Sequence, residues 1–147
     1  MSPQNPYSEA NAASLTELTN FANSLSEKQL VTPMPADWTV AAVLAHLAFW
    51  DFRSITLIKK WQAEGISASP NDVDVVNEAT RPFLVAIEPR RAVQISLSIA
   101  AELNQLIDSL SPDFLQDVSE NGKTVRLDRS THRYNHIREI KAALGVK

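Results

Sequence analysis

The strongest constraint on the fold is one long amphipathic segment with apolar residues on two sides. It runs from about Val40 to Glu64, with Thr39 as the expected N-cap and Gly65 as the expected C-terminal stop. At 100° per residue, one apolar side consists of Val43, Leu47, Trp50, Leu57 and Trp61. The opposite side, where a surface helix would be charged, carries Ala41, Ala45, Ala48, Phe49 and Phe52. We expect this second side to be buried, in a homodimer interface or against another helix of the same chain.

Helical periodicity recurs along the rest of the chain, and strand signals are scarce. Further helices are expected at about residues 8–25, 72–87, 88–110 and 128–145. Asn71 is the expected cap of the second of these, and Asp128 is the expected cap of the last. The connection over residues 111–127 is expected to contain at most a short turn of helix. Five helical pieces without a convincing strand predict an all-α bundle, in a single domain spanning residues 1–147.

Composition excludes several classes of function. The chain has no cysteine, which excludes disulfides, thiolate zinc ligands and cysteine nucleophiles and fits a reducing compartment. The first residues lack the basic start and apolar run of a signal peptide, and no apolar stretch reaches the roughly 18 residues of a membrane span. A net charge of −3 argues against a nucleic-acid binder. We therefore expect a cytoplasmic protein that acts on a small molecule, with no membrane or nucleic-acid partner.

Charge is distributed unevenly along the chain. Residues 123–147 carry seven Lys or Arg against two acids, whereas residues 1–122 carry seven bases against fifteen acids. The basic segment is either a solvated helix surface or a means of attracting an anionic small molecule toward the last helix.

All three histidines fall on two of the expected helices. His132 and His136 are four residues apart, which puts both imidazoles on one face of the last helix, with Cβ atoms about 6 Å apart. His46 lies far upstream, at the edge of the apolar stripe of the long helix. If these two helices pack side by side, the three rings can share one divalent metal ion. Neutral imidazole is a good ligand for zinc, nickel, copper or iron, and three protein ligands leave a position open for water or substrate.

Other interpretations of the histidines stay open at this point. A histidine at the edge of an apolar face is often a hydrogen-bonded structural residue, and a His-x-x-x-His spacing is a weak motif by itself. The sequence has neither a His-Glu-x-x-His motif nor paired Glu-x-x-His motifs, so it does not support a zincin site or a ferritin-like di-iron site. The protein is then either a metal-dependent enzyme or a non-catalytic bundle that binds or sequesters a ligand, with the metal structural or absent.

The segments around the histidines resemble two helices of the DinB/YfiT-like proteins. In that family a Trp followed by Ser or Thr opens the second helix, a His follows eight residues after this Trp, and a Trp-acid pair comes soon afterwards. This pattern is matched by Trp38, Thr39, His46, Trp50 and Asp51. The last helix of the family carries His-x-x-x-His followed by an aliphatic residue, an amide or acid, and Ile. This second pattern is matched by His132, His136, Ile137, Glu139 and Ile140. Spacing and order agree from about residue 10 to residue 144.

The resemblance implies a homodimeric four-helix bundle, here with an additional short helix and long connections. It also implies a divalent metal, usually nickel or zinc, on His46, His132 and His136. Members of the family include thiol S-transferases that use bacillithiol or glutathione, mycothiol-dependent maleylpyruvate isomerases and metal-dependent hydrolases. The mycothiol branch tends to have Glu in place of His132, so the match favours the all-His branch. The expected function is a thiol S-transferase or a hydrolase acting on a small electrophile. Because the chain has no cysteine, the thiol would be an external low-molecular-weight co-substrate.

Two charged residues next to the histidines of the last helix are candidate catalytic groups. Arg129 lies one turn before His132. It could hold a substrate carboxylate through a bidentate contact, or form a salt bridge with Asp128, Glu139 or another helix. Glu139 could orient His136, serve as a general base, or be a surface charge without a role in the site.

Three residues of the long helix are not expected to take part in the chemistry. Asp51 could hydrogen-bond near the site, but at helical spacing it points well away from His46. Trp50 and Trp61 are expected in the core rather than as platforms for a substrate.

Overall fold

The computed structural model describes residues 5–147, so residues 1–4 of the expected single domain lie outside the described part. The elements in chain order are α1 (Ser8–Ser24), α2 (Glu27–Leu30), β1 (Pro33–Met34), η1 (Pro35–Asp37), β2 (Trp38–Thr39), α3 (Val40–Glu64), α4 (Val73–Val85), α5 (Pro89–Ser109), α6 (Pro112–Asn121) and α7 (Ser130–Leu144). The strands β1 and β2 form a short antiparallel pair. The predicted all-α class is therefore confirmed for the part of the chain that the structure describes.

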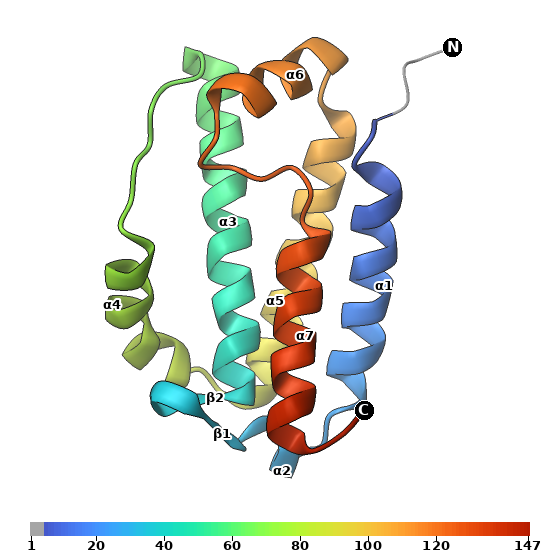
Figure 1. Ribbon diagram of the computed structural model, residues 1–147, viewed down its shortest axis with the longest axis vertical. Coiled ribbons are helices and arrows are strands. Elements are labelled where there is room, and N and C mark those ends of the chain that lie inside the picture. Colours follow the sequence, from blue (N-terminus) through green and yellow to red (C-terminus); the bar gives the residue numbers. More distant parts are fainter. Residues whose placement is uncertain (1–4) are drawn as a thin grey trace.

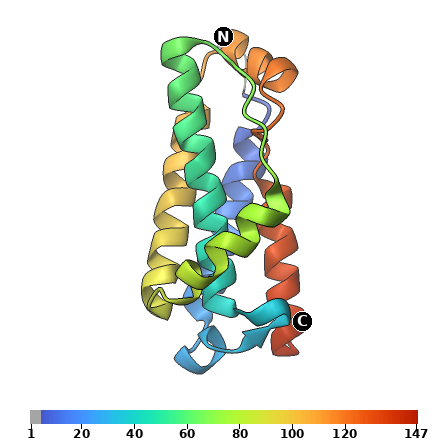
Figure 2. The same ribbon diagram turned by 90° about the vertical axis from the view of Figure 1, so that its left-hand side faces the viewer.

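Four long helices, α1, α3, α5 and α7, lie side by side along the long axis of the molecule (Figure 1). α3 packs against α5, α5 against α1, α1 against α7, and α7 against α3, which closes the ring. α4 crosses the outer side of α3 (Figure 2), and α6 lies at the end of the ring opposite the short strands (Figure 1). This order makes neighbours of α3 and α7, the two helices that carry the histidines.

Both ends of α3 are determined by local interactions that the sequence predicted. The Thr39 hydroxyl accepts a hydrogen bond from the Ala42 N–H at 3.1 Å. After Glu64 the chain turns at Gly65, whose φ of 87° lies in a region that residues with a Cβ rarely adopt. The expected limits of this helix are confirmed.

Some of the expected helix starts need correction. α4 is capped by Asp72, whose carboxylate accepts a hydrogen bond from the Val75 N–H at 3.2 Å, so the expected cap at Asn71 is wrong. Asp128 accepts a hydrogen bond from the Ser130 N–H at 2.9 Å, but it stands one residue before the N-cap position of α7. An aspartate serves at both starts because its short carboxylate reaches the free N–H groups of the first helical turn.

Two helices have no separate counterpart in the sequence-based prediction. α2 is a single turn whose N-cap, Ser26, forms a reciprocal capping box with Gln29. α6 is ten residues long, which exceeds the short turn expected between residues 111 and 127. Its N-cap is Ser111, whose hydroxyl accepts a hydrogen bond from the Phe114 N–H. In each case a serine hydroxyl satisfies N–H groups that would otherwise lack a partner.

The core consists of two apolar clusters. One contains the first half of α3, and the other contains its second half together with residues of α6. Along α3, the buried polar residues Asp51 and Ser54 fall between the two clusters. Polar side chains from the other long helices are also buried, namely Asn11, Ser14, Ser96, Asn104, Ser130 and Arg133. Buried polar groups are costly without partners, so this region needs an explanation that apolar packing does not supply.

The second apolar side of α3 is largely covered by the chain itself. Ala41, Ala45 and Ala48 are at most 3% exposed, and the last two share an apolar groove with isoleucines of α5. Phe52, on the same side, is 51% exposed. For the alanines, the partner is thus another helix of the same chain, whereas Phe52 stays at the surface.

Among the helices within residues 5–147, α3 is the only one that is long and apolar enough to cross a membrane. Its most apolar 18-residue window has a mean hydropathy of 1.3, so the sequence-based exclusion of any such stretch was too strict. Within that window 67% of the residues are buried inside the protein, which is typical of a central core helix.

Candidate metal centre

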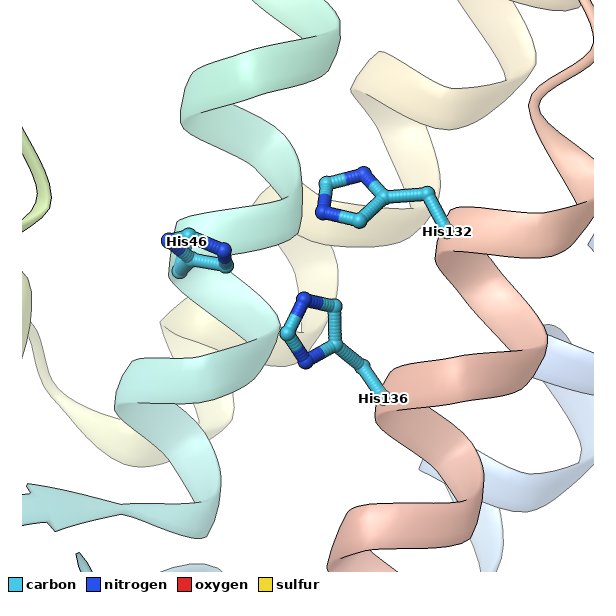
Figure 3. A group of neighbouring side chains, drawn as sticks. All are labelled: His46, His132 and His136. Atoms are coloured by element: carbon cyan, nitrogen blue, oxygen red, sulfur yellow. The ribbon is translucent and has the colours of Figure 1, made fainter. Parts of the chain in front are cut away.

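The structure brings all three histidines together between α3 and α7 (Figure 3). The ring centroids of His132 and His136 are 4.8 Å apart. The ring centroid of His46 lies 4.9 Å from that of His136 and 5.7 Å from that of His132. One nitrogen from each ring lies within 4.8 Å of the other two. These three side chains could therefore hold one metal ion.

The separation of the nitrogens is close to what a shared ion requires. Two imidazole nitrogens that bind one zinc ion at about 2.1 Å can be at most about 4.2 Å apart. The longest separation, 4.8 Å, exceeds this limit by an amount that small side-chain rotations can remove. In addition, Nδ1 of His46 is buried and has no hydrogen-bond partner within residues 5–147. Leaving a buried nitrogen unsatisfied is costly, so a ligand at this point would relieve a cost present in the protein alone.

The surroundings keep two of the rings in the form that binds metal. Burial lowers the pKa of His46 to about 4, with a smaller contribution from His136. Burial also lowers the pKa of His132 to about 2, and the positive charge of Arg129 lowers it further. Both imidazoles are therefore neutral near pH 7, and neutral imidazole has the lone pair that a metal needs.

Glu139 is placed to orient His136. Its carboxylate Oε2 lies 2.9 Å from Nδ1 of His136. Because an ionised carboxylate can only accept, His136 donates from Nδ1, and its Nε2 keeps a free lone pair. Metal-binding histidines usually donate their other nitrogen to such a partner. Glu139 does not line the cavity described below, so the contact corresponds to the orienting role among the roles predicted for it.

Arg129 forms the salt bridge to another helix that was one of its predicted roles. Its Nε and Nη2 donate to Oδ1 of Asp51 at 3.0 and 2.8 Å. Nη2 also lies 3.0 Å from Nδ1 of His132. A guanidinium only donates, so this nitrogen accepts, and a neutral ring then carries its proton on Nε2. If the neutral ring of His132 binds a metal through Nε2, its proton must be on Nδ1. Nδ1 then cannot accept the hydrogen bond from Arg129, so this coordination and that hydrogen bond exclude each other.

Asp51 contributes to the site in a way that sequence reasoning missed. It is only 1% exposed, and it contacts His132 indirectly through Arg129. The relevant signal was present in the sequence, since Asp51 is the only acid in the apolar part of α3. A single acid in an apolar helix indicates a buried basic partner, because an unpaired buried charge is strongly unfavourable.

Arg133 is a second residue that sequence reasoning did not identify. Its guanidinium is buried and donates to the Asn11 carbonyl at 2.9 Å, to Ser14 Oγ at 3.0 Å and to Asn104 Oδ1 at 2.8 Å. It also approaches the second oxygen of Asp51 at 4.0 Å. One carboxylate thus faces two guanidinium groups, which leaves excess positive charge buried behind the histidines. The spacing of four residues between Arg129, the N-cap of α7, and Arg133 could have indicated that the two side chains lie on the same side of the helix.

Aromatic side chains surround His46. The ring centroid of Trp38 lies 5.5 Å from that of His46, and that of Trp50 lies 6.5 Å from it, both in edge-to-face geometry. Trp50 is only partly buried, and its Nε1 donates to Oδ1 of Asn77 at 2.9 Å, which ties α3 to α4. Trp61 lies in the core, as expected, whereas Trp50 lies in the wall of a cavity.

That cavity has a volume of about 1090 Å³ and is lined by all three histidines. Its other walls come from α3, from the start of α4 and from the segment between α6 and α7, which crosses from α3 to α7 in Figure 1. Small-molecule sites commonly have volumes of about 300–1,000 Å³, so the cavity is large enough for a substrate of that kind.

Comparison of the chain with protein-family models, curated proteins and solved structures finds no match. The resemblance to DinB/YfiT-like proteins therefore stays a prediction from the two motifs, and the function is argued below from the site.

Proposed function

We propose that this protein is a metal-dependent enzyme of the DinB/YfiT-like type, a four-helix bundle in which His46, His132 and His136 hold a divalent ion, nickel or zinc. The observation that carries the proposal is the approach of one nitrogen from each ring to within 4.8 Å of the others. The same side chains line the 1090 Å³ cavity, which would give a small molecule access to the ion.

The proposed reaction is the transfer of an external low-molecular-weight thiol to a small electrophile, or the hydrolysis of such an electrophile. When bound, the ion would supply Lewis acidity that lowers the pKa of a thiol or a water in an open position. The chain's own residues prepare this site. Burial keeps two imidazoles neutral, and Glu139 holds the ring of His136. Glu139 acts through His136 in this scheme, so we assign it as a positioning residue. Arg129 would have to release Nδ1 of His132 before this ring binds the ion through Nε2, and its place in the scheme is the ion pair with Asp51.

Metal analysis tests the proposal directly. Protein purified without a histidine tag should contain close to one equivalent of nickel or zinc, and His46→Ala should lower the affinity at least 100-fold. Asn135→Ala is the matched control, because this exposed residue of α7 lines the same cavity but has no imidazole to bind the metal. Less than about 0.2 equivalents of metal, unchanged in His46→Ala, would remove the metal-dependent mechanism.

A thiol panel tests the transferase form of the proposal. Metal-loaded protein should accelerate the reaction of monochlorobimane with at least one small thiol, and His46→Ala should abolish the acceleration. A rate that does not depend on any thiol at saturating metal would exclude the transferase and leave the hydrolase or the non-catalytic bundle.

A second candidate function is a non-catalytic bundle that binds or sequesters a ligand, with the metal structural or absent. The observation that favours it is the hydrogen bond from Arg129 to Nδ1 of His132, which is incompatible with coordination of an ion through Nε2 of a neutral His132. Ligand binding that persists in the presence of a chelator, together with no turnover of thiol or ester substrates, would support this candidate over the enzyme.

We also propose that the protein is a cytoplasmic homodimer. Phe49 and Phe52, on the second side of α3, border an apolar groove of about 320 Å³, and Phe52 is exposed. Association would remove this apolar surface from water. Light scattering should give a dimer at micromolar concentration and a monomer for Phe52→Glu. A monomeric wild-type protein would contradict this assembly.

A further inference from the structure

Basic side chains line the cavity beyond the histidines. Arg53 lies seven residues after His46, which puts both on the same face of α3 about 10 Å apart along the helix axis. Lys123 and Arg126, from the segment between α6 and α7, line the same cavity. We call these three residues, Arg53, Lys123 and Arg126, the basic cluster.

The charge of the basic cluster is not balanced by the protein. None of the ion pairs within residues 5–147 involves any of its three members. Asp128 is the single acid among the lining residues, and its Oδ1 accepts hydrogen bonds from the N–H and hydroxyl of Ser130. A concave surface with charge of one sign attracts ions of the opposite sign, because the low-dielectric walls focus the field.

Arg53 is held in place by the protein and still has donors to offer. Its Nη1 donates to the Thr124 carbonyl at 3.2 Å, and its Nη2 donates to the Ser69 carbonyl at 3.0 Å and to Ser69 Oγ at 3.2 Å. The guanidinium carbon also lies 5.8 Å from the ring centroid of Trp50. These three hydrogen bonds leave at least two of the five N–H donors of a guanidinium without a protein acceptor. A guanidinium that is fixed in advance loses little entropy when it binds an anion.

We propose that the basic cluster binds the oxyanion group, a carboxylate or a phosphate, of a small molecule whose other end reaches the three histidines. The separation of about 10 Å between His46 and Arg53 corresponds to an extended chain of about eight carbon atoms. The reach to the histidines rests on the metal site of the proposed function, whereas the oxyanion site does not depend on it. The buried positive charge of Arg129 and Arg133 behind the histidines favours an anionic molecule further.

The first experiment tests the oxyanion site in metal-free protein. Calorimetry in a chelating buffer of low ionic strength should show that octanoate binds at least tenfold more tightly than 1-octanol, which has the same apolar chain. The double variant Lys123→Glu, Arg126→Glu should remove this preference without changing the binding of octanol. Both residues are exposed and make no side-chain ion pair in the described part of the chain, so the fold should tolerate the change.

Two further variants complete this experiment. Arg53→Gln should also lower the affinity for octanoate, but it could loosen the contacts to Ser69 and Thr124, so circular dichroism must accompany it. Lys60→Glu is the control, because it reverses one positive charge, as each of the two substitutions in the double variant does, at an exposed position of α3 that does not line the cavity. Equal binding of octanoate and octanol, or an equal loss of affinity in Lys60→Glu, would overturn the proposal.

The second experiment tests the spacing in cobalt-loaded protein, with absorbance as the readout of thiol binding. 8-Mercaptooctanoate should bind at least tenfold more tightly than either 8-mercapto-1-octanol or 3-mercaptopropionate, and 8-mercaptooctylphosphonate shows whether phosphate-like oxyanions are preferred over carboxylates. If cobalt does not bind, the proposed function fails and the octanoate result still stands. If cobalt binds and neither eight-carbon acid has an advantage over the alcohol, the proposed link between the oxyanion and the histidines is wrong.

Discussion

α3 meets its two neighbours in the ring through surfaces of opposite character. Toward α5 it presents small apolar side chains, among them Ala45 and Ala48, next to the isoleucines of that helix. Toward α7 it presents His46 and Asp51, which meet histidines and buried arginines. Both surfaces are buried, so the difference between them does not come from exposure to water.

The apolar contact between α3 and α5 stabilises the fold, whereas the polar contact between α3 and α7 carries the side chains of the proposed site. Apolar burial contributes roughly 25 cal/mol per Å², and a buried ion pair is often no more stable than apolar residues of the same volume. Stability alone therefore does not explain why the α3–α7 contact is polar. Its polar groups are consistent with the function proposed for the site, and the following predictions test how independent the two surfaces are.

The largest effect is expected for Asp51→Ala, which should lower the free energy of unfolding by roughly 3–5 kcal/mol. The substitution leaves Arg129 and Arg133 buried without a counter-ion. Urea unfolding measures the change. Glu102→Ala is the control, because its ion pair with Lys59 spans 3.8 Å between side chains that are 48% and 60% exposed, and such pairs contribute at most about 1 kcal/mol. A loss as small as that of the control would show that the polar contact does not depend on this carboxylate.

Leu103→Ala probes the apolar side and should cost about 3 kcal/mol in unfolding free energy. Leu103 is fully buried in the second apolar cluster, so truncation leaves a cavity. The affinity for zinc or nickel, measured by competition with a chelator, should stay within about twofold of the wild type. A larger change in affinity would mean that the two surfaces of α3 are coupled.

Acid should weaken the polar side selectively. Since the pKa of His46 is about 4 in the folded protein and about 6.5 in the unfolded chain, the unfolded chain binds the proton first. The stability is complete above pH 6.5 and falls as the pH approaches 4, by roughly 2–3 kcal/mol from this residue alone. Urea unfolding of metal-free wild type and His46→Ala at pH 7 and pH 4.5 isolates the effect. Parallel pH profiles of the two proteins would contradict the lowered pKa.

The smallest effect is expected for Glu139→Ala, which should weaken metal binding about tenfold, or about 1.4 kcal/mol. The variant removes the acceptor that orients His136. Glu139→Gln should lose less, because its amide oxygen can still accept from Nδ1. Isothermal titration with zinc and nickel measures both variants. Equal affinities in all three proteins would indicate that the contact between Glu139 and His136 does not tune the site.

The local parts of the structure were accessible from the sequence. The limits of α3 follow from Thr39 and Gly65, and the pairing of His132 with His136 on one face follows from their spacing. The wrong cap at Asn71 and the underestimated α6 concern loops, where several polar residues compete for the same role. Such competition cannot be decided without the rest of the fold.

The sequence alone determined the four long helices, their apolar faces and the types of side chain that each face carries, because these depend on contacts within a few residues. Only the tertiary structure decided that α7 closes the ring against α3, that Asp51 pairs with Arg129 across 78 positions, and that the segment after α6 covers a cavity over the histidines. These arrangements depend on which faces remain unburied after all the helices have packed. Helical periodicity shows that a face needs a partner, but it does not show which helix will provide it.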